Sequence, residues 1–154
     1  PGELRGDFDL TRDLGLLYAN TECGIFGVLP QENRPEAVGE AIPVARRTEV
    51  RTGKAVILAN CRGNEVCAYE IEIEKLYGGS APTRNLLLRV TDPALIALTG
   101  GIVQGMSGSP IVQDGKLVGA VTHVLLDDPQ RGYGIFAENM LSASGMTAQS
   151  AASA

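Results

Sequence analysis

A serine in a glycine-rich turn, Ser107, is the residue whose type and setting best suit covalent chemistry. It lies in the sequence GMSGSP, residues 105–110, immediately before an apolar run. Gly105 can adopt backbone angles that aim its N–H, together with that of Ser107, at one point, and Gly108 leaves room for a substrate. The turn therefore predicts a nucleophile, Ser107, beside an oxyanion hole formed by the amides of Gly105 and Ser107. A plain Gly-Ser turn between two strands is the alternative interpretation.

Two other side chains could assist such a serine. Asp92 stands between Thr91 and Pro93, ahead of an apolar stretch, where a carboxylate caps a helix and contributes about 1 kcal/mol without any catalytic role. His123, the only histidine, lies in the second strand predicted after Ser107. It could line the substrate cleft, pack as an ordinary core histidine, or act as a general base, which must come within about 3 Å of the serine hydroxyl.

Metal and cofactor chemistry is not expected from the available ligands. The chain has three cysteines, Cys23, Cys61 and Cys67, with no CxxC pair, and one histidine. A structural zinc site needs four such ligands. Cys61 and Cys67 flank a turn-like stretch, so they either form a disulfide across a hairpin or remain two reduced, buried thiols.

The composition is that of one ordinary globular domain. The chain has 154 residues, of which 44% are hydrophobic and 20% charged, and its net charge is −5. An acidic protein without a basic cluster is poorly suited to nucleic acid, because neutralisation of phosphates supplies most of that affinity. No apolar run approaches the roughly 18 residues that a membrane-spanning helix needs.

The elements that would position these residues are mostly short strands. Apolar runs bounded by glycine and proline predict strands over residues 24–29, 41–45, 55–59, 66–76, 85–90, 111–113, 117–126 and 133–137. The dipeptide Asp114-Gly115 between two of them is a strong hairpin signal. Helical segments are expected over 92–99 and 138–144. We expect an irregular lead-in or a rim strand over 1–22, and a flexible Ala/Ser-rich tail over 146–154.

Several of these segments resemble one peptidase family. GMSGSPIV followed by DGKLVGAVT, residues 105–122, resembles the nucleophile region of chymotrypsin-like serine peptidases. The resemblance extends to the peptidase domain of the stage IV sporulation protein B family. It rests on GIFG (24–27), AIPV (41–44), TEV (48–50), TDP (91–93), residues 100–110, GAVTHV (119–124), DP (128–129) and GYG (132–134).

This resemblance implies an all-β, mainly antiparallel fold over residues 1–145. The expected architecture is a trypsin-like double β-barrel whose first barrel is incomplete in this chain. The family's serine falls on Ser107 and its aspartate on Asp92, so Asp92 is either a triad member or a helix cap. The family's histidine belongs to an upstream Gly-His motif that no position here matches. The chain is therefore expected to lack its general base.

The resemblance also implies how a peptide substrate would bind. The residues Thr122, His123 and Val124 are expected to form the strand that pairs with the substrate backbone. Gly101 is expected near the base of the specificity pocket. Because Gly101 carries no charge, it argues against a preference for Lys or Arg.

In biological terms the resemblance implies a serine endopeptidase of endospore formation. Such an enzyme cleaves itself and a protein of a regulatory membrane complex, which leads to activation of a sigma factor. It would be secreted or membrane-anchored in the space between forespore and mother cell. The alternative is a peptide-binding module that holds an extended peptide by strand addition and does not turn it over. Exposed strand edges predict a homodimer or a strand swap.

Overall fold

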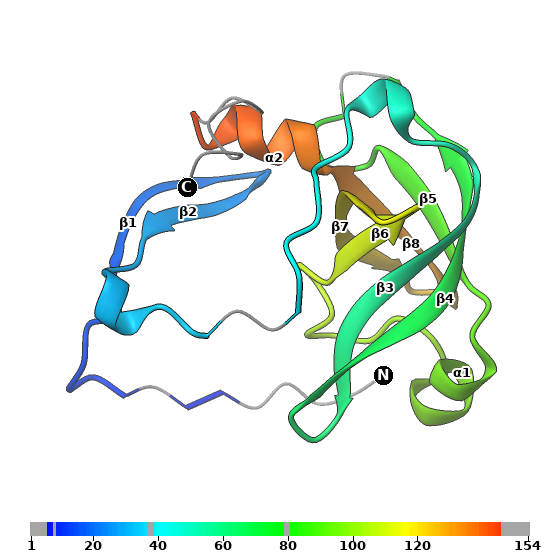
Figure 1. Cartoon of the computed structure of the whole chain (residues 1–154). Helices are drawn as coiled ribbons and strands as arrows, with labels where there is room; N and C mark the ends of the chain where they lie inside the picture. The colour runs from blue at the N-terminus through cyan, green and yellow to red at the C-terminus, as the bar shows by residue number, and fades with distance from the viewer. Residues whose placement is uncertain (1–5, 8, 37–38, 79–80, 146–154) are drawn as a thin grey trace.

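A closed, six-stranded antiparallel barrel forms most of the structure (Figure 1). The computed structural model describes residues 6–7, 9–36, 39–78 and 81–145. The barrel order is β3-β4-β5-β8-β7-β6, and the ring closes where β6 pairs with β3. The all-β, antiparallel prediction is confirmed. The six strands are β3 (Gly53–Arg62), β4 (Glu65–Leu76), β5 (Leu86–Val90), β6 (Pro110–Gln113), β7 (Lys116–Leu125) and β8 (Asp128–Phe136).

A separate two-stranded sheet stands beside the barrel. Its strands are β1 (Leu16–Thr21) and β2 (Gly24–Val28), which pair only with each other (Figure 1). Among the described residues this hairpin is the only sheet outside the barrel. Within residues 1–22, where the sequence predicts an irregular lead-in or a rim strand, β1 covers Leu16–Thr21 and belongs to this hairpin instead of to the barrel.

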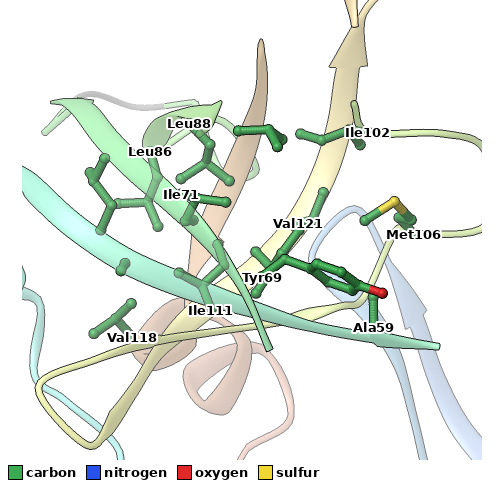
Figure 2. Close-up of a cluster of buried hydrophobic side chains, with 14 of the residues drawn as sticks. Ala59, Tyr69, Ile71, Leu86, Leu88, Ile102, Met106, Ile111, Val118 and Val121 are labelled. Atoms are coloured by element: carbon green, nitrogen blue, oxygen red, sulfur yellow. The ribbon is translucent and has the colours of Figure 1, made fainter. Parts of the chain in front are cut away.

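Alternating side chains on β4 show why this sequence forms a barrel wall. Tyr69, Ile71 and Ile73 are buried, whereas the glutamates between them face outward. A strand with this period of two places one face in the core and one in solvent. The inward face joins a single cluster to which the loop before Ser107 contributes Ile102 and Met106 (Figure 2).

The Asp114-Gly115 turn joins β6 to β7 as predicted. Gln113 pairs with Lys116, which leaves a two-residue connection. Both connecting residues have positive φ, 51° at Asp114 and 75° at Gly115. This backbone matches the twist of the flanking strands.

Two short helices flank the barrel. The helix α1 (Pro93–Thr99) begins after Asp92 and ends at Gly100, whose φ is 78°. The helix α2 (Ala137–Ala143) follows β8 directly. Both predicted helices are confirmed. Two single 3₁₀ turns, Gln31–Asn33 and Arg47–Glu49, lie in the long connection from β2 to β3.

The strand predicted over residues 41–45 is wrong. Only Val44 forms an isolated bridge, parallel to Leu117 of β7. Pro43 supplies a carbonyl to the Leu117 amide but has no N–H of its own, so a ladder cannot continue through it. The strand β8 also starts earlier than predicted, at Asp128. The tail predicted over 146–154 lies outside the described residues.

Candidate active site

The turn that carries Ser107 is held on the end of the barrel from both sides. Met106 is buried in the core, and its sulfur lies 3.4 Å from the amide nitrogen of Val103, which donates to it. The Gly108 amide donates to the carbonyl of Val121, at 2.8 Å, and the Val121 amide donates to the carbonyl of Ser109, at 3.0 Å. Because Met106 is anchored inside, the neighbouring Ser107 is turned outward and is exposed.

The amides of Gly105 and Ser107 are available to a ligand. Neither donates a hydrogen bond to any residue that the structure describes. Gly105 has φ 96°, a conformation that L side chains rarely adopt, and a Cβ there would have open space around it. The turn therefore needs glycine for its backbone conformation, and this conformation exposes two donors of the kind that stabilise an oxyanion.

The Ser107 hydroxyl is directed to β7. Its Oγ donates to the carbonyl of Thr122, 3.2 Å away. The hydroxyl of Thr122 is in turn held by two carbonyls, those of Thr83 and Tyr133, at 2.9 and 3.2 Å. Thr83, which no sequence motif marks, thus helps to place the strand segment that contacts Ser107.

The strand β7 has a free edge beside Ser107. Its pairing with β6 ends at Ala120, opposite Pro110. A Cβ on Gly132 of β8 would lie 2.4 Å from the carbonyl oxygen of His123, so that carbonyl faces β8. The register between β7 and β8 shifts between Val121 and His123, and the Thr122 carbonyl faces the Ser107 hydroxyl instead of β8. This edge, predicted to bind the substrate backbone, has no strand partner among the described residues.

Two clefts meet at Ser107. The first, of about 560 Å³, extends toward the end of β3. It is lined by Leu58, Ala59, Asn60, Cys61, Thr99, Val103, Gln104, Gly105, Met106, Ser107 and Ser109. The second, of about 430 Å³, lies between Ser107 and the tip of the β1–β2 hairpin, and includes Thr122, His123 and the tip residues 20–25. Neither the end of β3 nor the hairpin tip was predicted as part of the site, because only the barrel brings these segments to Ser107.

His123 is exposed and lines the second cleft. Its Cα pairs with that of Tyr133 on β8. The hydroxyl of Ser107 donates to the neighbouring backbone carbonyl and not to the imidazole. The geometry thus favours a cleft-lining role for His123 over that of a general base.

Asp92 caps α1. Its Oδ1 accepts from the amides of Ala94 and Leu95, at 2.8 and 3.2 Å, and its Oδ2 accepts from the amide of Glu70 on β4, at 3.0 Å. These bonds, first among them the one from Glu70, lower the pKa of Asp92 below its ordinary value of 3.8. Asp92 lines neither cleft at Ser107. The structure therefore accounts for this carboxylate as a helix cap.

The cysteines are all free thiols in the structure. Cys61 lies in the wall of the first cleft, close to Cys67 and to the hydroxyl of Tyr69. Burial raises the pKa of the Cys61 thiol. Among the described residues no three His, Cys, Asp or Glu side chains cluster as metal ligands, and no helix there is long and apolar enough to cross a bilayer.

A comparison with protein families identifies the chain. The SpoIVB peptidase S55 family matches residues 1–141, nearly the whole sequence. The chain belongs to this family. The S55 family is one of serine peptidases, and the match includes the Ser107 turn and both clefts. No curated protein matches the chain significantly.

Solved structures similar to this S55 chain have the same fold. The active form of the Rv3671c protease from M. tuberculosis superposes with a TM-score of 0.54 and 22% identity, over 86% of this chain and 59% of that one. The inactive form of that protease superposes with a TM-score of 0.55 and 19% identity, over 85% of this chain and 65% of that one. The S55 chain thus spans less than two thirds of the length of these proteases. The trypsin-like fold is confirmed.

Gly101, predicted at the base of the specificity pocket, is buried and lies against β8. A Cβ on Gly101 would come 2.3 Å from the carbonyl oxygen of Pro129. Gly101 lines neither cleft at Ser107. Its role in substrate binding stays a prediction.

Proposed function

We propose that this chain is the nucleophile-bearing part of a serine endopeptidase. The observation that carries the proposal is the Ser107 turn, in which an exposed hydroxyl adjoins two amides without partners among the described residues. A carbonyl placed on those amides would lie next to the Ser107 oxygen, and its peptide could extend along the free edge of β7. In this arrangement the hydroxyl would attack the peptide carbonyl, the two amides would stabilise the oxyanion, and the strand edge would hold the peptide.

The general base of this proposed enzyme is a histidine outside the described residues, in the upstream Gly-His motif that the family resemblance implies. Within those residues the Ser107 hydroxyl bonds to the Thr122 carbonyl, which cannot take up its proton. A histidine on the opposite side of Ser107 would accept the proton and return it to the leaving amine. The chain by itself is therefore proposed to react slowly or not at all.

We also propose the biological setting that the resemblance implies. The enzyme would act in endospore formation, in the space between forespore and mother cell, cleaving itself and a protein of a regulatory membrane complex. Cleavage would release a signal that activates a sigma factor. Support for this proposal comes from the family alone.

A second proposal concerns self-association through the β1–β2 hairpin. Its side chains include several large apolar groups that are more than half exposed, namely Leu16, Leu17, Tyr18, Ile25 and Val28. Such an edge is suited to pairing with a second copy, as a dimer or by strand exchange. Light scattering across a range of concentrations tests this, and a monomeric mass throughout would count against it.

Labelling with a fluorophosphonate probe tests the peptidase proposal. The chain is compared with a longer chain that includes the upstream Gly-His segment, each beside its Ser107→Ala variant. Labelling only in the longer chain, lost in Ser107→Ala, is the expected result. Equal labelling of this chain and the longer chain would mean that the general base lies within the 154 residues, and His123 would be the first candidate. Labelling in neither favours the second candidate, a peptide-binding module, which the free edge of β7 also supports.

A further inference from the structure

The side chain of Ile102 fills a space beside Gly132 of β8, next to the free edge of β7, and we call this space the slot. On β8, Gly132 pairs with Val124 and has no side chain to occupy the space next to it. A Cβ added to Gly132 would come 2.7 Å from the Cδ1 of Ile102, so the end of the Ile102 side chain already lies there. Ile102 is only 4% exposed.

The backbone on either side holds Ile102 in this slot. Its amide donates to the carbonyl of Pro129 on β8, at 2.8 Å. The preceding Gly101 lies so close to the same carbonyl that no side chain fits there. Ile102 also packs in the core cluster at the barrel end that carries Met106 (Figure 2). The backbone of Ile102 is therefore held against β8, while its side chain is packed in the core.

The slot is where the side chain next to the reacting carbonyl would go. A peptide residue that puts its carbonyl on the amides at Ser107 would lie at the free edge of β7, beside Thr122 and Val124. The Thr122 hydroxyl is bonded to the carbonyls of Thr83 and Tyr133 and lines the second cleft, so that side is occupied. The side chain of the peptide residue would then take the face of Val124. Val124 packs against the cluster that contains Ile102, so this face leads toward Gly132 and Ile102.

Neither cleft at Ser107 extends into this space. The residues that line them include neither Ile102 nor Gly132. The first cleft lies toward β3 and the second toward the hairpin tip, whereas the slot lies between the Ser107 loop and β8. A large side chain at the reacting residue would thus collide with Ile102.

We propose that Ile102 determines substrate specificity by restricting the residue that supplies the reacting carbonyl to a small one, glycine, alanine or serine. The inference rests on the proposed function only for the placement of that carbonyl at the Gly105 and Ser107 amides. It concerns binding, so it holds whether or not Ser107 then reacts. Removal of the Ile102 side chain beyond Cβ would open the slot to a larger residue.

Binding of product-like peptides tests this without requiring turnover. Acetylated tetrapeptides with a free carboxylate, identical except for a final Ala or Phe, are titrated into the chain while backbone amide shifts are followed by NMR. The carboxylate would occupy the Gly105 and Ser107 amides. The Ala peptide should bind at least about tenfold more tightly, since even one methylene changes pocket affinity by about that factor.

Variants of Ile102 give the deciding comparison. In Ile102→Ala the Phe peptide should gain at least about tenfold and overtake the Ala peptide. Ile102→Val should give a smaller change in the same direction, and it keeps the test valid if the alanine variant does not fold. Ile73→Val, which removes the same methyl from a buried site on β4, is the matched control and should leave the preference unchanged.

The outcomes separate this inference from the peptidase proposal. Equal affinity of the two peptides for the unmodified chain, or binding of neither, would overturn it. So would an unchanged preference in both Ile102 variants. A clear preference for Ala together with no Ser107 labelling in the longer chain would leave the inference standing and refute only the peptidase proposal.

Discussion

Replacement of Asp92 separates its two proposed roles. In the structure this carboxylate accepts three backbone hydrogen bonds, two from the first turn of α1 and one from Glu70 on β4. The bonding is reciprocal, because the Glu70 carbonyl accepts from the amides of Thr91 and Asp92. Asp92 therefore fastens the start of α1 to the barrel wall, and its loss should affect stability first.

The expected magnitude follows from these bonds. Loss of an N-cap side chain costs about 1 kcal/mol. Loss of the acceptor for the Glu70 amide adds about 1 kcal/mol, less than the usual value of about 1.5–3 kcal/mol for a charged acceptor because water can partly replace it. Asp92→Ala should thus lower the free energy of unfolding by about 2 kcal/mol. Asp92→Asn keeps an oxygen for the cap but not both acceptors, and should cost about 1 kcal/mol.

Urea unfolding followed by circular dichroism measures these changes. Asp128→Ala is the matched control, because the half-exposed Asp128 carboxylate makes only two weak contacts, a 3.3 Å bond from the Gln130 amide and a 3.8 Å ion pair with Arg131, and its loss should cost less than about 0.5 kcal/mol. The contribution of Asp92 to stability should also depend on pH. Because the pKa of Asp92 is lowered in the folded state, its contribution is present above the ordinary value of 3.8 and is lost as pH falls through the lowered pKa.

One pattern of results would refute the cap interpretation. If Asp92→Asn left stability within about 0.5 kcal/mol of the unmodified chain but abolished Ser107 labelling in the longer chain, Asp92 would act on the catalytic histidine. The cap interpretation requires the opposite, a loss of stability with labelling retained at temperatures where the variant is folded.

Three further predictions concern backbone conformation and charge. Gly105→Ala strains a residue at φ 96° and should slow fluorophosphonate labelling of the longer chain about 100-fold by displacing one oxyanion donor, while the thermal midpoint falls modestly. Gly101→Ala should cost at least about 1 kcal/mol more in urea unfolding than Gly100→Ala, because both have positive φ but only Gly101 faces a backbone carbonyl at its missing Cβ; equal costs would contradict this. Lys116→Ala should raise the pKa of Glu49 toward its ordinary value of 4.5, because the hydrogen bond from the Lys116 ammonium group is the largest cause of its lowering. An NMR titration of the Glu49 carboxyl measures this pKa, and an unchanged pKa would contradict the prediction.

The features that the sequence predicted correctly obey rules that act over a few residues. The period of two in β4, the Asp114-Gly115 turn and the Asp92 cap with Gly100 at the end of α1 depend on local backbone conformation. The one strand predicted wrongly, over residues 41–45, had enough apolar residues but contained Pro43, which removes a donor from any ladder. In that segment apolar content was a weaker guide than hydrogen-bonding capacity.

The nucleophile itself could also be found in the sequence, because a serine set among glycines implies a special turn. The surroundings of Ser107 could not. Its partner, the Thr122 carbonyl, is 15 residues away, and the clefts bring the end of β3 and the tip of the β1–β2 hairpin to the same oxygen. Nothing in the spacing of these segments indicates that they meet.

By itself, the sequence determined the strands, the turns, the helix caps and the serine that could react, since each depends on the conformational preferences of neighbouring residues. Closure of the barrel determined what lies around that serine. It gave β7 a free edge where its pairing with β6 stops, placed Ile102 in the space that Gly132 leaves on β8, and bound Asp92 to β4. These contacts join residues far apart in the chain, so they depend on strand register and side-chain packing, which only the tertiary structure specifies.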